Sequence, residues 1–220
     1  MKITPKAPTK VCFLEVQLDQ LTTDYLWKII DNAKIKKTDY KKNLAGNISQ
    51  SLELNDHKNY FYKTVCIPCV NEFRKANLGK DPIPNTVIME RDTRLLLNGF
   101  WVNYQYQTEF NPQHNHKGVY SFAIWLKIPY DWREQSKMNQ FDGIEEKNIK
   151  AGNFEFTFTD FLGNIQTTGF QLSPKLEGTM LFFPAALKHA VYPFYGTSEP
   201  RISIAGNLMF DTTNQPLLPN

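Results

Sequence analysis

The sequence predicts an α+β domain that is mainly β, in which N-terminal helices cover one face of an antiparallel sandwich or barrel. Two observations predict this class. Apolar residues recur at helical spacing in the first third of the chain, and from about residue 86 the apolar period changes to two. The later segments are short, carry turn signals and have no helical segment between them, which is typical of antiparallel all-β cores.

The composition is that of an ordinary folded protein. Of the 220 residues, 41% are hydrophobic and 14% are aromatic, which is enough for a sizeable core. We expect a single domain over residues 1–220, with a helical and mixed part (1–85) and a β core (86–220). The net charge of +3 is concentrated in KIKKTDYKKN (34–43). We interpret this run as a solvated helix end or loop, because no Arg-rich stripe supports nucleic-acid binding.

Three sequence features favour a cytoplasmic protein. The N-terminal MKITPKAPTK has no apolar core and no small-residue cleavage site, so we expect no signal peptide. No run approaches the roughly 18 apolar residues of a membrane span. Cys12, Cys66 and Cys69 form no even framework, which favours a reducing compartment. The last two have the spacing of a redox or zinc half-site, but without a second such pair we interpret them as structural.

The N-terminal third predicts one strand and one helix before a loop. Residues 11–18 (VCFLEVQL) have the pattern of a strand. Residues 21–34 (LTTDYLWKIIDNAK) place apolar residues at helical spacing, with Thr22 or Thr23 as the N-cap. Residues 44–54 (LAGNISQSLEL) predict a loop and a short strand.

A second helix is expected over residues 58–77. Phe61, Val65 and Phe73 recur along it at helical spacing. Pro68 lies inside the pattern and should kink or shorten the helix, because proline lacks the N–H that the helical ladder needs.

Seven later segments predict β-strands, because they are short runs with alternating apolar residues bounded by turn signals. In NFEFTFTDF, Phe154, Phe156 and Phe158 should face one side of a sheet and the polar residues the other. DFLGNIQ (160–166) contains a Gly-Asn pair and predicts a hairpin turn. The predicted strands cover residues 86–107, 119–129, 153–161, 165–172, 179–185, 189–194 and 201–210.

Two of the four histidines, His114 and His116, are spaced to share one face of a strand end. Two imidazoles on one face can share a metal ion such as Fe, Zn, Cu or Ni. Two exposed loop histidines explain the pair equally well when it is taken alone. A third histidine, His189, strengthens the metal hypothesis because it begins a later strand directly after a Pro-containing turn.

Arg201 opens an otherwise apolar strand, with Ser203 on the same face. A buried arginine needs an anionic partner, and its planar fork binds a carboxylate bidentately. Ser203 can donate to the same carboxylate. The alternative is an ordinary salt bridge to Glu109, Glu155 or Glu177.

Together these parts resemble the iron/2-oxoglutarate-dependent oxygenase superfamily, and in particular the prolyl-4-hydroxylase-like oxygenases of bacteriophage and marine bacteria. The resemblance covers residues 97–210, about half of the chain. The segments that carry it are FNPQHNHKGVYSFAIWLKIP and EGTMLFFPAALKHAVYPFYGTSEPRISIAGNLMF. It implies a double-stranded β-helix, or jelly roll, with the N-terminal helices packed on one sheet.

The resemblance also implies the site. Fe(II) would be held by His114, His116 and His189. 2-Oxoglutarate would chelate the metal, with its far carboxylate on Arg201 and Ser203.

Three further residues are candidates for the co-substrate site. Tyr104 and Asn103 are alternative donors to the far carboxylate, and the sequence does not separate them. Trp125 stands where many relatives place a tyrosine, so that tyrosine's hydrogen bond is absent, and the indole would instead wall the pocket.

His116 departs from the superfamily pattern. Most members have Asp or Glu at this position, which gives a ligand set of two histidines and one carboxylate. An imidazole here removes one negative charge from the site, and three neutral histidines are also a normal zinc set. Iron remains the expected metal, with zinc as the alternative. If His116 were not a ligand, water would fill its place.

The expected function is Fe(II)- and 2-oxoglutarate-dependent hydroxylation of an unidentified substrate, with release of succinate and CO2. One alternative is a cupin-like metalloprotein, with iron or zinc, that does not use 2-oxoglutarate. Another is a non-catalytic binding or virion-associated module. The expected partner is a small-molecule co-substrate, without a membrane or nucleic acid, and a homo-oligomer is left open. Residues 131–153 form a long polar segment that we expect to be the lid, since such loops decide specificity.

Overall fold

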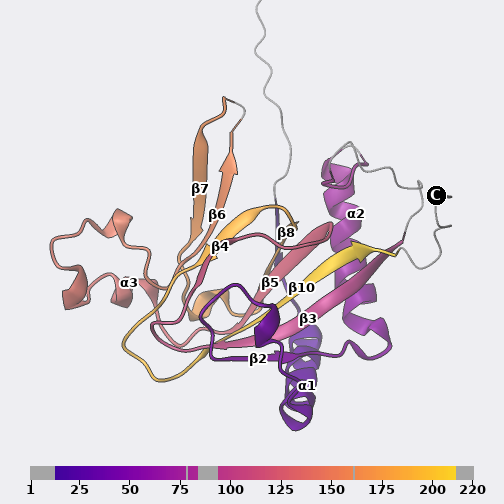
Figure 1. Cartoon of the computed structure of the whole chain (residues 1–220), viewed down its shortest axis with the longest axis horizontal. Coiled ribbons are helices and arrows are strands. Elements are labelled where there is room, and N and C mark those ends of the chain that lie inside the picture. Colours follow the sequence, from indigo (N-terminus) through magenta and orange to yellow (C-terminus); the bar gives the residue numbers. More distant parts are fainter. Residues whose placement is uncertain (1–12, 78, 84–93, 161, 212–220) are drawn as a thin grey trace, which may run out of the picture.

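Two antiparallel sheets form the body of the protein in the computed structural model, which describes residues 13–77, 79–83, 94–160 and 162–211 (Figure 1). The larger sheet has the strand order β1-β8-β5-β10-β3-β2 and the smaller one β4-β9-β6-β7. This jelly-roll-like sandwich confirms the predicted fold class. The strands of the larger sheet are β1 (Leu14–Gln17), β8 (Thr179–Pro184), β5 (Tyr120–Lys127), β10 (Arg201–Phe210), β3 (Leu95–Gln105) and β2 (Gln50–Glu53); those of the smaller sheet are β4 (Asn111–His114), β9 (Lys188–Val191), β6 (Phe154–Thr159) and β7 (Ile165–Phe170).

The predicted strands agree with those observed to within a few residues at each end. One strand, β4, was not predicted, because its sequence NPQH has no apolar alternation. The predicted strand 86–107 is observed from Leu95, and residues 84–93 lie outside the described part. The predicted strand 11–18 is observed as β1 from Leu14, and residues 1–12, which include Cys12, also lie outside the described part.

The long helix α1 (Gln20–Lys36) begins earlier than the sequence suggested. Asp19 is its N-cap, and its carboxylate accepts a hydrogen bond of 2.7 Å from the backbone N–H of Thr22. The prediction of Thr22 or Thr23 as the cap was therefore wrong. An ionised carboxylate one turn upstream satisfies the orphan N–H groups of the first turn better than a hydroxyl inside it.

The second helix has two parts. A π-helical turn (Tyr62–Cys66) passes into α2 (Ile67–Ala76), and Pro68 stands in the first turn of α2. The change of hydrogen-bond pattern beside Pro68 is the predicted interruption, and proline is tolerated at a first turn because its missing N–H would lack a helical partner there.

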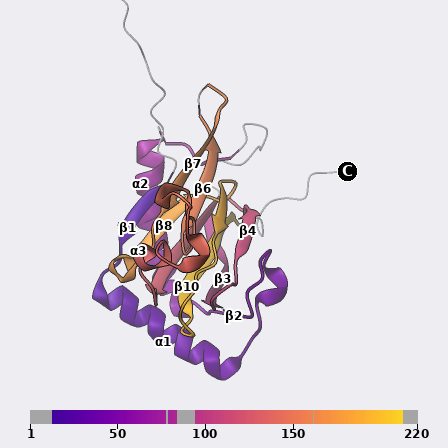
Figure 2. The ribbon, with the colours of Figure 1, turned by 90° about the vertical axis from the view of Figure 1, so that its left-hand side faces the viewer.

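Both helices pack on the outer face of the larger sheet (Figures 1 and 2). Leu26 and Ile30 of α1 and Phe73 of α2 belong to one buried cluster with Val102 of β3 and Tyr120 of β5. A second cluster lies between the two sheets. The helices thus cover the outer face of the larger sheet, and the smaller sheet lies over its inner face. A site can therefore lie between the two sheets.

The strand β6 follows the predicted alternation. Phe154 and Phe156 are buried between the sheets, and Phe158 is half-buried farther along the strand. Glu155 points to the other face, where it bonds to Lys150 and Tyr192. The predicted hairpin is also present, since β6 and β7 pair from Thr159↔Ile165 to Phe154↔Phe170.

Cys66 and Cys69 are free thiols inside the helical core. Burial raises the pKa of the Cys66 thiol well above its ordinary value and that of Cys69 to about 11. Both thiols therefore stay protonated at neutral pH and lack the thiolate that redox or zinc chemistry requires. This agrees with a structural role for the pair.

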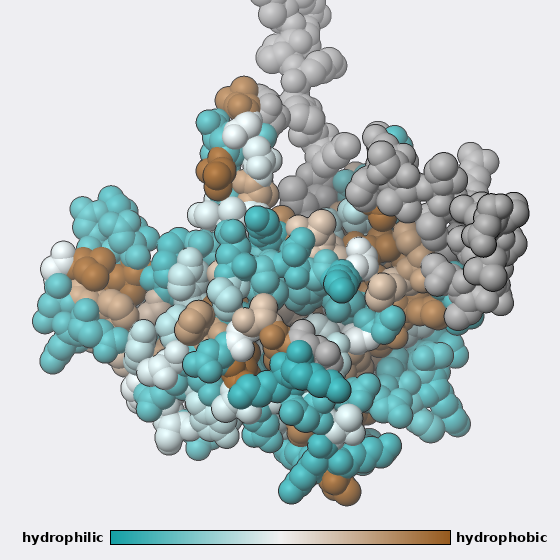
Figure 3. Space-filling view, viewed as in Figure 1, coloured by the Kyte–Doolittle hydropathy of each residue, from teal (hydrophilic) through white to brown (hydrophobic). Residues whose placement is uncertain are grey.

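Hydrophilic residues dominate the face seen in Figure 3. The basic run is exposed at the end of α1 and in the following turn, with Lys34 paired to Asp31 of the same helix. Apolar colour stands out at the tip of the β6–β7 hairpin, where Leu162 and Ile165 are exposed. Within the described ranges, no helix is long and apolar enough to cross a membrane.

Candidate metal and co-substrate site

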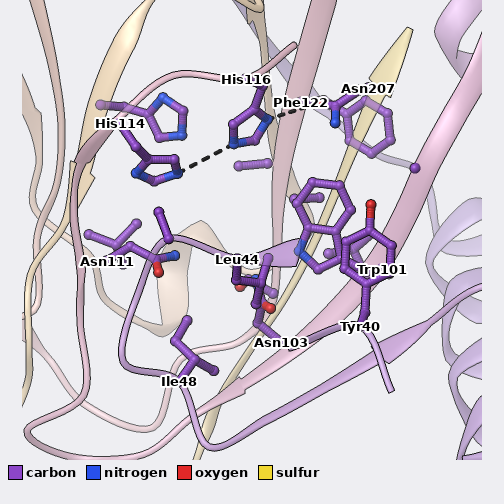
Figure 4. A pocket seen from close by; sticks show the side chains of 18 of the residues that line it. Tyr40, Leu44, Ile48, Trp101, Asn103, Asn111, His114, His116, Phe122 and Asn207 are labelled. Carbon is purple, nitrogen blue, oxygen red and sulfur yellow. Dashed lines mark hydrogen bonds between the residues drawn. The ribbon is translucent and has the colours of Figure 1, made fainter. Parts of the chain in front are cut away.

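The three histidines of the predicted set lie together on the smaller sheet. His114 ends β4 and pairs directly with His189 of β9. His116 follows β4 by two residues, and its backbone N–H donates to the carbonyl of Ala185 at 2.8 Å. One ligand nitrogen from each ring lies within 4.8 Å of the others. All three line a cavity of about 600 Å³ that opens on the inner face of the sandwich (Figure 4).

Backbone carbonyls fix the tautomers of two of these rings. His114 Nδ1 lies 2.7 Å from the carbonyl oxygen of Pro112, and His189 Nδ1 lies 3.1 Å from that of Leu187. A carbonyl can only accept, so Nδ1 of each ring carries the proton and Nε2 keeps its lone pair. This is the orientation that metal-ligating histidines usually have.

The third ring is held by side chains. His116 Nδ1 lies 2.8 Å from Asn207 Oδ1, which also accepts a hydrogen bond of 2.7 Å from the Ser121 hydroxyl. His116 Nε2 therefore faces His114 Nε2 at 3.4 Å with no proton between them (Figure 4). Two such lone pairs repel, and a cation between them removes the repulsion. The arrangement therefore fits a metal ion.

Burial keeps the three imidazoles neutral. It lowers the pKa of His114, lowers that of His116 to about 4, and lowers that of His189 well below its ordinary value. The neighbouring rings add to this effect, because His114 lowers the pKa of His116, and both of them lower the pKa of His189. Neutral imidazole is the form that binds metal, so no proton has to leave before binding at neutral pH.

The contact between Asn207 and His116 predicts an effect on metal binding. Asn207→Leu removes the nearer acceptor of the Nδ1 proton and leaves the ring held at this nitrogen by the Ser121 hydroxyl alone, which lies 3.1 Å away. We expect the affinity for Fe(II) or Zn(II) to fall by about 10-fold to 100-fold, the usual effect of losing such a partner. Calorimetric metal titration under anaerobic conditions measures it. An unchanged affinity would show that Asn207 does not orient the ligand, and Asn71→Leu, at an exposed position of α2 outside the cavity lining, is the control.

Arg201 lies at the other end of the same cavity. It is the first residue of β10 and is 1% exposed. Its guanidinium donates to the Tyr130 hydroxyl, to the carbonyl of Gly152 at 3.1 Å and to Gln105 Oε1. All three acceptors are neutral, so the buried charge has no counter-charge in the described protein.

The alternative salt bridges of Arg201 are not formed. Glu109 accepts from the backbone of Ser49 and of Tyr106. Glu155 pairs with Lys150, and Glu177 accepts from the backbone of Ile128 at 2.8 Å. In the part of the chain that the structure describes, no carboxylate lies within ion-pair distance of Arg201.

Side chains alternate between the two faces of β10, β3 and β5, and this decides which of the other candidate residues reach the cavity. Ser203 of β10 pairs with Asn103 of β3 on one side and with Trp125 of β5 on the other, and all three line the cavity. Tyr104, the next residue of β3, points to the opposite face and lies in the helical core. The structure thus brings Asn103 to the site and does not bring Tyr104 to it.

Sequence reasoning missed several residues of this site. Gln105 and Tyr130 hold Arg201, and Asn207 holds His116. Asn207 and Gln105 could have been found by extending the alternation from Arg201 and Asn103 along the same faces. Tyr130 lies beyond the end of β5 and has no such signal.

The segment expected to be the lid does not line the cavity. Residues 131–153, which contain α3 (Trp132–Gln135), form a segment at the side of the sandwich in Figure 1, and none of them lines the cavity. A wall comes instead from the segment 40–48, through Tyr40, Leu44, Ala45 and Ile48.

The jelly-roll-like sandwich brings three converging imidazoles and a buried arginine without a carboxylate partner into one cavity. This arrangement fits a metal-dependent enzyme that uses an oxo acid. Comparison with known proteins gives the family. Residues 99–207 match the family model described as "Putative 2OG-Fe(II) oxygenase". This part of the chain, which contains all three histidines and Arg201, belongs to that family. The protein is therefore an oxidoreductase of the Fe(II)- and 2-oxoglutarate-dependent type.

One solved structure supports this fold. The chain is similar to a Pseudomonas putida prolyl-4-hydroxylase, with 10% identity, a TM-score of 0.50, and coverage of 90% of this chain and 91% of that one. It is also similar to an oxidoreductase of the 2OG-Fe(II) oxygenase family from Burkholderia pseudomallei, with 14% identity, a TM-score of 0.42, and coverage of 76% and 64%. A search of curated protein sequences found no match.

Proposed function

We propose that the protein hydroxylates a C–H bond of its substrate while 2-oxoglutarate is converted to succinate and CO2. In this proposal His114, His116 and His189 hold Fe(II), and Arg201 binds the far carboxylate of 2-oxoglutarate. The observation that carries it is the buried Arg201, which has only neutral partners and shares a cavity with three unprotonated Nε2 atoms.

The guanidinium has the donors that this role needs. Arginine carries five N–H groups, and the bonds to Tyr130, Gly152 and Gln105 use three of them. Two N–H groups are left for a carboxylate, which suits the bidentate geometry of such pairs. Ser203, on the same face of β10, offers a hydroxyl beside them. A dicarboxylate that reaches from the metal to Arg201 would supply the missing counter-charge.

The protein and its cofactors divide the chemistry. Bound Fe(II) and 2-oxoglutarate supply oxygen activation coupled to decarboxylation. The three imidazoles hold the metal, while Arg201 sets which end of the co-substrate faces it. Trp125, Phe154 and Phe183, which also line the cavity, limit the access of water to it. A dry site strengthens the ion pair between Arg201 and the carboxylate.

The ligand set affects the charge of the site. Three neutral imidazoles balance none of the double positive charge of Fe(II). The near carboxylate of 2-oxoglutarate would balance half of it, because the far carboxylate is paired with Arg201. We propose that this favours iron bound together with the 2-oxoglutarate dianion. Zinc would bind to the same three nitrogens but would not support the oxidation.

We further propose that the protein works in the cytoplasm of a bacterial or phage-infected cell, with 2-oxoglutarate as its small-molecule co-substrate. The free, buried thiols of Cys66 and Cys69 support a reducing compartment. The resemblance of residues 97–210 to oxygenases of phage and marine bacteria supports the setting.

Succinate release tests the proposed function. Purified protein with Fe(II), 2-oxoglutarate and O2 should form succinate slowly even without substrate, and zinc in place of iron should give none. His189→Ala should abolish this turnover, whereas His57→Ala, at an exposed position outside the site, should not change it. Iron binding without any succinate would contradict the proposal and would favour a metalloprotein that does not use 2-oxoglutarate.

A further inference from the structure

Trp101 presents an unused hydrogen-bond donor at the cavity. It lies on β3 on the same face as Asn103, and its side chain is 5% exposed. Its indole Nε1 is buried and has no hydrogen-bond partner in the described part of the chain. Leaving such a donor unpaired costs free energy, so a buried indole N–H usually has an acceptor.

The indole is fixed beside the metal site. Its ring stacks on Tyr40, with 4.8 Å between centroids and an angle of 11° between planes. Its other neighbour is the ring of His116, at a centroid distance of 5.7 Å. In Figure 4 the indole nitrogen faces the space below the histidine pair, with Asn111 on the other side of that space. A group bonded to this nitrogen would therefore lie close to the metal.

The segment 40–48 closes this end of the cavity. Asn47 and Phe110 exchange two backbone hydrogen bonds, of 2.9 Å and 3.3 Å, which hold the segment against the start of β4. Gly46 packs so tightly that an added Cβ would lie 1.5 Å from Asn111 Oδ1 and 2.6 Å from the carbonyl oxygen of Phe110. The segment is thus fitted to the cavity, and it contributes the apolar side chains Leu44, Ala45 and Ile48.

The charges around the cavity limit what can bind to Trp101. Among the lining side chains, Arg201 is assigned to the co-substrate, and the three imidazoles are neutral. Glu53 and Lys117 also line the cavity but are exposed. A charged oxygen buried at Trp101 would find no side-chain counter-charge, and the charge of the metal would already be shared with the co-substrate carboxylate, whereas a neutral carbonyl oxygen would need neither.

We propose that Trp101 is a substrate-positioning residue: its indole N–H donates to a neutral carbonyl oxygen of the substrate, and the apolar part of the substrate packs on Leu44, Ala45 and Ile48. This inference rests on the proposed function. It defines the substrate as a neutral, carbonyl-bearing and partly apolar molecule, such as an amide. The hydrogen bond would orient the C–H bond next to the carbonyl group toward the metal.

The test is an NMR titration of the zinc-loaded protein saturated with 2-oxoglutarate, with N-acetylleucine N-methylamide as the probe. The four tryptophans give four indole N–H signals, and Trp101→Phe assigns the one of interest. We expect the probe to shift the Trp101 signal downfield and to leave that of Trp132, outside the cavity, in place. Trp101→Phe keeps an aromatic ring on Tyr40 but loses the donor, so it should bind the probe about threefold to tenfold more weakly.

Two comparisons make the test decisive. Trp132→Phe is the matched control and should bind the probe as the native protein does. N-acetylleucine, which carries a carboxylate instead of the methylamide, should bind about tenfold more weakly. If the probe moves the Trp101 signal no more than the Trp132 signal, or if Trp101→Phe binds it equally well, the inference is wrong.

The result separates this inference from the proposed function. The visible charge-transfer absorption of the iron form with 2-oxoglutarate is recorded on the same variants. A Trp101 shift without that absorption would overturn the proposed function and leave the carbonyl site standing. The absorption without a Trp101 shift would overturn the carbonyl site alone.

Discussion

Arg201→Met is expected to abolish 2-oxoglutarate binding and to leave metal binding intact. Truncating one partner of a buried charge pair usually costs several kcal/mol, so the dissociation constant should rise by at least about 100-fold. Methionine keeps much of the volume of the side chain and removes the only buried positive charge that the described residues place at the cavity. Anaerobic calorimetry with 2-oxoglutarate, on protein already loaded with metal, measures the change.

Two further variants show whether the charge itself is responsible. Arg201→Lys keeps the charge but loses the planar fork, so it should bind 2-oxoglutarate with an intermediate affinity. Arg133→Met changes an exposed arginine of α3 and should have no effect. Because Gln105 and Gly152 lose their donor in Arg201→Met, thermal unfolding must show that the variant is folded. A folded Arg201→Met protein that binds 2-oxoglutarate normally would remove this residue from the co-substrate site.

His116→Ala is expected to lower the affinity for Fe(II) by more than about 100-fold, because loss of a ligand exceeds the effect of losing a partner behind it. His116 Nε2 lies 3.4 Å from His114 Nε2, and both are unprotonated. The same substitution at His114 or His189 should give a loss of the same order, since the three ligand atoms lie within 4.8 Å of one another. Anaerobic titration with iron, followed by calorimetry, gives the affinities.

His57→Ala is the matched control, because His57 is exposed and lies far from the cavity in the sequence and outside its lining. It should bind iron as the native protein does. If His116→Ala also binds iron normally while His114→Ala and His189→Ala do not, only two histidines are ligands. The departure from the carboxylate pattern would then mean an open position filled by water.

The local pattern of apolar residues was sufficient to predict much of the fold. The strands β5, β6 and β10 have apolar residues or glycine on every second position, so their existence and their faces follow from the sequence. The strand β8 is a continuous apolar run, so the sequence indicates a strand buried on both faces. The hairpin between β6 and β7 follows from its Gly-Asn turn. The strand β4 has no such alternation, and it exists because its backbone pairs with β9, which no local signal reveals.

The site could be predicted as far as its residues lie in motifs. The three histidines and Arg201 stand in the segments that resemble the oxygenase superfamily, and the structure places them in one cavity. The partners of Arg201 could not be predicted. Tyr130 and Gly152 are separated from it by about 70 and 50 residues, respectively, and reach it only after the chain returns across the sandwich.

The cavity wall could not be predicted for the same reason. The segment 40–48 lies more than 60 residues before His114, and it reaches the metal site through the paired backbone of Asn47 and Phe110 and the stacking of Tyr40 on Trp101. The polar segment 131–153 was expected there because long polar loops often cover active sites. Its composition alone could not show that it packs to the side of the sandwich.

The most direct test of a single site for metal and co-substrate is an anaerobic titration of the native protein with Fe(II) and 2-oxoglutarate, followed by visible absorption. An Fe(II) ion chelated by a 2-oxo acid gives a charge-transfer absorption that neither component gives alone. We expect it to appear at one equivalent of each, to vanish in His189→Ala, and to be lost in Arg201→Met at the same concentrations. Iron that binds tightly without producing this absorption would contradict the account, because the histidines and Arg201 would then not hold one co-substrate between them.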